Sequence, residues 1–152
     1  MSNNERAMKI YGDICDVLDA KGWNYTRRED SLAIVLSVRG NDLEMDLLIR
    51  VDSERQLVSI VSPMPFAMSD EKRIDGAIAT CAATYKLADG SFDYDVNSGK
   101  IYFRLTSTYR GCDIGEGLLE YMVDVSLSTI DVYNDKFMAL NKGYIDIKSF
   151  FE

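Results

Sequence analysis

The sequence has no histidine, and this absence excludes several kinds of active site. Histidine is the usual general base near neutral pH and the commonest metal ligand. Nucleophile pairs of the Ser-His or Cys-His type therefore cannot form within the chain. No pattern of carboxylates or lysines points to another chemistry. We expect a protein that is not an enzyme, with no catalytic residue, no metal site and no cofactor.

Cysteine and long apolar runs are also scarce. The three cysteines are widely spaced, and we expect reduced thiols, with Cys15 and Cys81 in the core and Cys112 in a turn. Apolar runs such as 32–36 are far shorter than the ~20 residues that span a membrane. The first residues lack the basic start and apolar centre of a signal peptide. The prediction is a cytoplasmic protein, folded as a single domain over residues 1–152.

Positive charge is in the minority, with 17 lysines and arginines against 25 aspartates and glutamates, for a formal net charge of −8. Such a surface repels the phosphates of nucleic acids and of anionic lipids. We therefore expect no nucleic-acid and no membrane partner. Basic or amphipathic protein segments fit this charge better.

Apolar periodicity and turn residues predict the order of helices and strands. The order is α-β-β-β-β-α-β-β-α, which favours an α+β fold with helices packed against a twisted antiparallel sheet. Pro63 and Pro65 should end the fourth strand, because neither can donate to a ladder. The expected elements are a helix over 3–21, a short strand opened by Trp23 and Tyr25, strands over 32–38, 42–51 and 56–62, a helix after Ser69, a hairpin over 92–105 and a helix over 115–141.

Two of these helices have apolar surface that must be covered. The helix over 115–141 is apolar around much of its circumference, whereas one packed face needs a stripe of only ~100°. The tail over 144–151 could fold back on it and leave a monomer, or a second copy could cover it in a homodimer, which we favour. The helix after Ser69 should bury a stripe formed by Ile74, Ala77, Ile78, Cys81, Ala82 and Tyr85.

Two surface features are candidate partner-binding sites. The strand over 42–51 alternates between an apolar face and a solvated face, which is common in sheets and could also hold a basic partner. The apolar segment Met64-Pro65-Phe66 is expected in a loop, where it either plugs the end of the core or forms an exposed patch. The acidic residues on the solvated side are Asp42, Glu44 and Asp46.

Two further motifs resemble ligand loops without the residues that would hold the ligand. The run from Asp93 to Gly99 begins like a calcium loop, but Ser98 and Arg104 stand where glycine and a bidentate glutamate are required. Glycines over 111–117 precede a helix, yet no Gly-Lys-Ser/Thr follows them. We interpret these motifs as a solvated hairpin face and a flexible turn.

A longer pattern resembles a known family. Its residues are Val61–Phe66, Ser69–Arg73, Tyr85–Asp95, Gly99–Ile101 and Arg104. This pattern is similar to the YbjN-like family of bacteria, described as sensory transduction regulators, whose members usually have asparagine where this chain has Thr84. The resemblance implies a fold similar to type III secretion chaperones. Those are small, acidic, usually dimeric proteins that hold unfolded segments of secreted proteins, and the resemblance implies no catalytic residue.

The leading hypothesis is a non-enzymatic protein-binding module, chaperone-like or regulatory, whose partner is a protein or peptide segment. The alternative is a small-ligand sensor with an apolar pocket. An enclosed cavity favours the sensor, and an exposed apolar groove favours the protein partner. The aromatic residues that could line such a pocket are Trp23, Tyr25, Tyr102 and Phe103.

Overall fold

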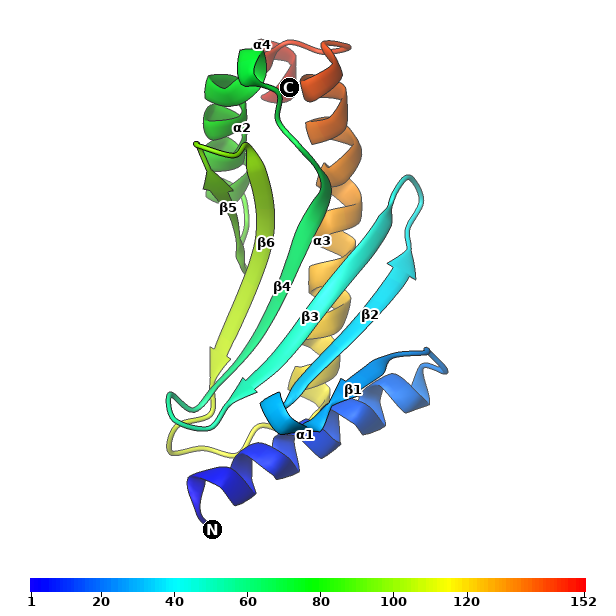
Figure 1. Cartoon of the computed structure of the whole chain (residues 1–152), viewed down its shortest axis with the longest axis vertical. Coiled ribbons are helices and arrows are strands. Elements are labelled where there is room, and N and C mark those ends of the chain that lie inside the picture. Colours follow the sequence, from blue (N-terminus) through cyan, green and yellow to red (C-terminus); the bar gives the residue numbers. More distant parts are fainter.

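One six-stranded antiparallel sheet carries its helices on one face, as the computed structural model of residues 1–152 shows (Figure 1). The strand order is β1-β2-β3-β4-β6-β5. The strands are β1 Thr26–Arg28, β2 Ala33–Arg39, β3 Glu44–Asp52, β4 Leu57–Ala67, β5 Ser91–Asp95 and β6 Lys100–Thr108. The helices are α1 Asn3–Ala20, α2 Arg73–Tyr85, α3 Glu116–Lys142 and α4 Ile147–Phe150, with 3₁₀ turns η1 Glu29–Ser31 and η2 Asp70–Lys72. The predicted α+β class and element order are confirmed.

The start of α1 follows directly from its sequence. Ser2 Oγ accepts a hydrogen bond from the Glu5 amide at 3.1 Å, and the Glu5 carboxylate accepts one from the Ser2 amide at 2.8 Å. This capping box satisfies two amides that a helix start leaves unpaired. Further along α1, Tyr11 donates to the carbonyl of Ala33 at 3.2 Å, which ties the helix to β2.

The core lies between the helices and the inner face of the sheet. Register aligns Ile34, Ile49 and Ile60 across β2, β3 and β4, and each is at most 1% exposed. At the other end of the sheet Phe92 packs edge-on against Phe103 and Phe137. The alternation of β3 is confirmed, because its apolar residues at 45, 47, 49 and 51 are buried and those at 44, 46 and 50 are exposed.

Two strand predictions are corrected. β1 begins at Thr26, so Trp23 and Tyr25 both lie before it. β4 continues through Pro63 and Pro65 to Ala67 instead of ending before them. The prolines fit because β3 stops pairing with β4 at Val61, so beyond that residue one edge of β4 needs no amide donors.

The second helix buries the face opposite to the predicted one. Its buried residues are small, namely Gly76, Ala79, Thr80 and Ala83. The larger residues point outward: Ile74 is 67% exposed, Tyr85 is 89% exposed, and Cys81 is exposed instead of being a core thiol. Close packing explains the inversion, because a Cβ at Gly76 would lie 2.6 Å from Tyr94 Oη and 2.8 Å from Met68 Cγ.

The chain's tail folds back over α3. Phe150 of α4 is buried and stacks on Phe137, with ring centroids 5.3 Å apart. Leu118, Tyr121 and Val132 are the large apolar residues of α3 that remain exposed. The tail therefore covers part of the surface that the sequence analysis assigned to a second copy. None of the helices, including α3, combines the length and apolar character needed to cross a membrane.

Candidate protein-binding site

The ladder between β4 and β6 is interrupted near the end of β4. Pro63 pairs with Tyr102, and the next pair joins Ala67 to Lys100. Three residues of β4, 64–66, thus stand opposite one residue of β6, Ile101. The two extra residues make β4 bow away from β6, as expected for a bulge that breaks the ladder.

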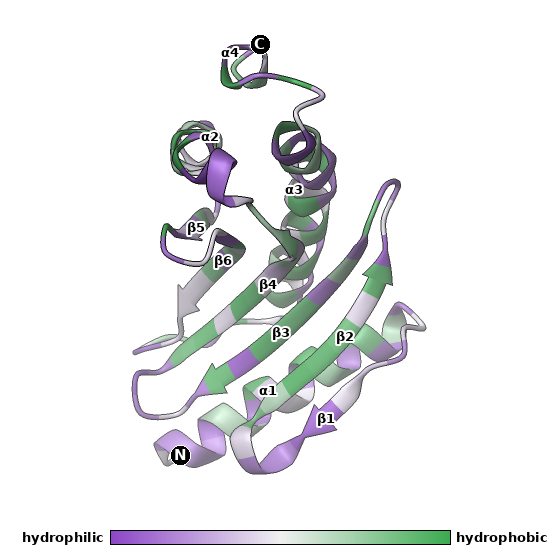
Figure 2. Ribbon diagram, turned by 45° about the horizontal axis from the view of Figure 1, so that its top comes forward, coloured by the Kyte–Doolittle hydropathy of each residue, from purple (hydrophilic) through white to green (hydrophobic).

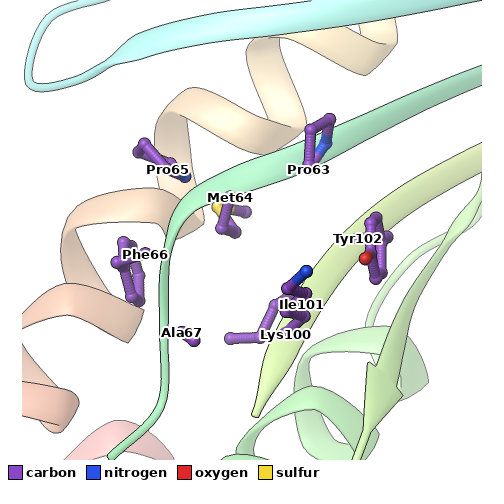
Figure 3. A pocket seen from close by; sticks show the side chains of 8 residues that line it. All are labelled: Pro63, Met64, Pro65, Phe66, Ala67, Lys100, Ile101 and Tyr102. Carbon is purple, nitrogen blue, oxygen red and sulfur yellow. The ribbon is translucent and has the colours of Figure 1, made fainter. Parts of the chain in front are cut away.

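The bow creates an opening of about 370 Å³ between the two strands (Figure 3). Met64 and Ile101 are buried there, whereas Pro63 and Pro65 are exposed and leave the opening accessible to solvent. Five of its eight lining residues are hydrophobic. The lining residues are Pro63, Met64, Pro65, Phe66, Ala67, Lys100, Ile101 and Tyr102.

Both alternatives for the segment Met64-Pro65-Phe66 apply in part. Met64 is 7% exposed and belongs to the core, and Phe66 packs against the core from the side of β4 that faces away from β6 (Figure 3). Pro65 is exposed at the surface. The segment therefore closes the end of the core with two side chains and presents Pro65 to solvent.

β3 and β4 separate at the same end of the sheet. Their last pair joins Leu48 to Val61, although β3 extends back to Glu44 and β4 extends on to Ala67. The two strands diverge beyond that pair (Figures 1 and 2). Their facing edges have no partner strand here, and such edges are templates for pairing with another chain.

The helix-free face has an apolar centre that leads toward the opening. Register aligns the half-buried Val35, Leu48 and Val61 in one row across β2, β3 and β4. In the next row Pro63 lies beside Tyr102. A continuous apolar strip thus joins the middle of the open face to the opening at its end.

The three acidic candidates lie on the far side of the separated strands. Glu44 and Asp46 are exposed on β3, and Asp42 is exposed in the turn before it. Asp46 accepts a hydrogen bond from Ser37 Oγ at 2.5 Å. The structure places these carboxylates along one edge of the separation and the apolar opening beyond its other edge.

The hairpin motif that resembles a calcium loop uses its carboxylates within the hairpin. Asp95 accepts hydrogen bonds from Ser98 Oγ at 2.7 Å and from the Asn97 amide at 3.0 Å, which lowers the pKa of this carboxyl. Asp93 forms an ion pair with Arg104 at 2.9 Å. Both side chains have a role in shaping the β5–β6 hairpin.

Thr84 stands where the sequence analysis noted an expected asparagine, and its hydroxyl contacts Phe92. Its Oγ1 accepts from the Phe92 amide at 2.9 Å and lies 3.4 Å from the Phe92 carbonyl. The hydroxyl therefore links the end of α2 to β5 and fills a polar role at this position.

The four aromatic residues of the sensor hypothesis do not line one pocket. Phe103 is fully buried in the core, and Tyr102 faces the opening on the other side of β6. Trp23 lies in a separate groove beside Gly40 and Asp131. Tyr25 is half-buried and donates a hydrogen bond to the Asp19 carboxylate at 2.7 Å. The predicted aromatic-lined pocket is therefore not formed.

A carboxylate cluster that sequence reasoning missed joins α1 to the start of α3. Carboxylate oxygens of Asp13, Asp16 and Glu116 lie within 4.8 Å of one another. Lys9 Nζ lies 2.9 Å from Asp13, and this pairing raises the pKa of the lysine. Asp16 and Glu116 are exposed, so water and Lys9 relieve the repulsion, and nothing further marks a metal site. No local spacing in the sequence could reveal this carboxylate cluster, because its residues come from two helices far apart in the chain.

The comparisons with known proteins bear on the fold. No protein-family model and no curated protein matches the chain. The chain is similar to a chain in the solved structure of the HopA1–SchA chaperone–effector complex, with a TM-score of 0.56 and 11% identity. The alignment covers 89% of this chain and 98% of that chain. At this identity the likeness shows the fold alone, and it confirms the expected chaperone-like architecture.

Proposed function

We propose that this protein is a non-enzymatic protein-binding module, chaperone-like or regulatory, which holds an extended segment of another protein on the helix-free face of its sheet. The observation that carries the proposal is the apolar opening between β4 and β6, lined by Pro63–Ala67 and Lys100–Tyr102. It adjoins strand edges that have no partner. By the criterion set from sequence, an exposed apolar opening favours a protein partner over a small ligand.

An extended segment has two ways to bind here. Its backbone can pair with the free edge of β3 before Leu48, which contains no proline, as in strand addition, where main-chain hydrogen bonds supply affinity. One of its apolar side chains can enter the opening, whose 370 Å³ lies within the range of ordinary ligand pockets, about 300–1,000 Å³. Both contacts require an extended conformation, so the partner is an unfolded or strand-forming segment.

Charge narrows the class of partner. Glu44 and Asp46 stand along the β3 edge of the separation, and the whole chain has a net charge of −8. Basic residues flanking the apolar anchor would meet these carboxylates, which favours association and orients the segment. The proposed ligand is an extended apolar segment with flanking lysines or arginines.

The chaperone-like fold supports this function by analogy, which is weaker support than the site itself. The similar structure is a chaperone–effector complex by its title. We propose a cytoplasmic location and no nucleic-acid or membrane partner, on the basis of the acidic composition. Membership of the YbjN-like family stays a prediction that rests on the motif over 61–104.

Peptide binding tests the proposal. The probes are fluorescent dodecapeptides that alternate valine or leucine with lysine, and a second set in which glutamate replaces lysine. We expect the lysine set to bind, and Tyr102→Asp to weaken that binding by about tenfold or more, because a carboxylate then borders the apolar opening. Thr106→Asp is the matched control, since it adds the same charge on the same face of β6, away from the opening.

Two results would overturn the proposal. One is that neither peptide set binds the wild-type protein at millimolar concentration. The other is that Tyr102→Asp and Thr106→Asp bind the lysine set equally well. Circular dichroism of both variants establishes that the comparison is made between folded proteins.

A further inference from the structure

One buried side chain of α3 has no hydrogen-bond partner. Asn134 is 1% exposed, and both its amide nitrogen and its amide oxygen are unpaired. The other buried polar side chains of the helices, Thr80 and Ser126, donate to carbonyls four residues earlier in the chain. Burying an amide without a partner is unfavourable, and nearly all buried polar groups in folded proteins are paired. Asn134 therefore marks a place where a hydrogen-bonding group is missing.

The helix α3 connects the two strands that separate. Its Asp131 carboxylate accepts hydrogen bonds from the Asn41 amide at 2.9 Å and from Asn41 Nδ2 at 2.6 Å, in the turn before β3. Further along, Asn141 Oδ1 accepts from the Ser69 amide at 2.8 Å, and Asn141 Nδ2 donates to the Ala67 carbonyl at 3.3 Å, at the end of β4. The part of α3 between these contacts therefore lies behind the gap between β3 and β4.

Asn134 faces β4 within this part of α3. Seven residues make nearly two helical turns, so Asn134 and Asn141 lie on the same side of the helix, about 10 Å apart along its axis. The helix packs against β4 and runs in the same direction (Figure 1). Since a strand advances about 3.3 Å per residue, Asn134 lies about three residues before Ala67, near Met64. There β4 no longer pairs with β3.

A segment in the gap presents alternate side chains to α3. The Val51 amide donates to the Leu32 carbonyl at 3.0 Å, which assigns the odd-numbered residues of β3 to β2 and the even-numbered ones to the other edge. The backbone of Glu44 and Asp46 therefore points into the gap and is available to a bound segment. Side chains of a segment paired there point in turn to the helix-free face and to α3.

Asn134 is covered in the absence of a bound segment. Phe66 is half-buried and lies on the side of β4 that faces away from β6 (Figure 3). A segment that enters the gap displaces Phe66 and brings one inward side chain against the Asn134 amide. An apolar side chain would leave the amide unpaired, whereas a hydroxyl or carboxamide would form a hydrogen bond with it.

We propose that Asn134 selects segments with a neutral hydrogen-bonding side chain, that of serine, threonine, asparagine or glutamine, at the inward position that meets α3. This inference rests on the proposed function, because it concerns the same bound segment. The neighbouring inward positions are apolar, since Ile130 and Phe137 flank Asn134 on the buried side of α3. An ionised side chain is disfavoured, because burying an unpaired charge costs more than burying an amide. A single polar position also fixes the register of the segment, as a buried asparagine does in coiled coils.

A threonine scan tests the inference. The parent is the valine–lysine dodecapeptide described above, and each member of the scan replaces one valine by threonine, which has the same shape. We expect at least one central replacement to strengthen binding to the wild type by about tenfold, because it supplies the missing partner of the Asn134 amide. Asn134→Leu should reverse this preference and bind the parent peptide better.

Ser128→Leu is the matched control. It makes the same polar-to-leucine change on the exposed side of α3 and should keep the preference for threonine. Thermal melting of both variants establishes that altered binding does not come from unfolding. The inference is overturned if no threonine peptide binds the wild type better than the parent, or if Asn134→Leu keeps the preference.

These outcomes are distinguishable from a failure of the proposed function. In both of them the parent peptide still binds the wild type, so the protein-binding site stands and only the role of Asn134 is lost. If no peptide of the scan and no parent peptide binds, the proposed function and this inference fail together.

Discussion

Val61 divides β4 into two regions with different properties. Before Val61 the strand pairs with both β3 and β6, and Ile60 is 1% exposed in the core. After Val61 the strand no longer pairs with β3, bows away from β6 and contains two prolines. The first region is built like the centre of an ordinary sheet, and the second has the free edges and accessible apolar surface that binding requires.

The difference teaches that stability and proposed function occupy separate parts of one strand. A fully paired and buried region can stabilise the fold, while a neighbouring region of the same strand lacks some of its backbone pairs. The same division recurs in α2, whose small inner residues hold the helix close to β5 while larger residues stay outside. The comparison is tested most directly by making the same kind of substitution in each region and measuring the two effects.

The largest expected effect comes from truncating matched buried residues in the two regions. Ile60→Ala should destabilise the protein by about 2–5 kcal/mol, because it leaves a cavity in the closed core. Met64→Ala should cost less, about 1–2 kcal/mol, since the space it leaves adjoins the solvent-accessible opening and water can enter. Urea denaturation of both variants measures the difference. Equal losses would show that the second region is as closed as the first.

The next effect concerns the clamp that holds the open end together. Arg73 Nε donates to the Met68 carbonyl at 3.1 Å, its guanidinium also donates to the Asn97 carbonyl, and it pairs with Asp70 at 2.8 Å. Arg73→Ala should lower the free energy of unfolding by about 1.5–3 kcal/mol, as expected for charge-assisted hydrogen bonds.

Arg104 provides the control for that clamp. Its side chain is 56% exposed and pairs with Asp93 at the surface. Arg104→Ala should cost less than about 1 kcal/mol, because exposed ion pairs contribute little. Thermal denaturation of Arg73→Ala and Arg104→Ala settles the ranking, and a larger loss for Arg104→Ala would refute the clamp.

A smaller effect of opposite sign is expected within α3. Asn134 is 1% exposed, and neither its amide nitrogen nor its oxygen has a hydrogen-bond partner. Asn134→Leu removes this unpaired group at similar volume, so it should stabilise the protein by about 1–2 kcal/mol. A lower melting temperature in Asn134→Leu than in the wild type would contradict this expectation.

The smallest expected effect is a dependence on acid pH in the β5–β6 hairpin. Hydrogen bonds from Ser98 and Asn97 lower the pKa of Asp95 below its usual value of 3.8. This carboxylate therefore contributes stability above pH 3.8, and the contribution is lost as the pH falls through the lowered pKa. The urea midpoint should fall less between pH 7 and pH 3 in Asp95→Asn than in the wild type. An identical fall in both would exclude Asp95 as a source.

Several features follow from local sequence because they depend on neighbours along the chain. The capping box of Ser2 and Glu5, the alternation of β3 and the β5–β6 hairpin all involve residues a few positions apart. The acidic composition and the absence of histidine likewise need no structure. These features were sufficient to predict the α+β class and the order of its elements.

The candidate binding site could not be predicted from the sequence, because it is formed by contacts between distant segments. Met64, Pro65 and Phe66 were recognised as unusual from sequence, but their partners Lys100–Tyr102 and the interrupted ladder were not. The bulge arises because β4 has three residues and β6 has one residue between the same two pairs. Neither segment shows this difference in its own sequence. The alternating pattern of β3 identified its acidic residues as solvent-facing. It did not show that they lie beside the point where β3 and β4 separate.

Sequence by itself determined the periodicities, caps, turns and charge of this protein, because each arises from residues close together in the chain. Only the tertiary structure decided which apolar face of α2 is buried and whether Pro63 and Pro65 end β4. The physical reason is the same in both cases. A helix with two apolar faces buries the one that fits its neighbour, here the small residues beside Tyr94, and a proline is tolerated in a strand where the adjoining strand has departed.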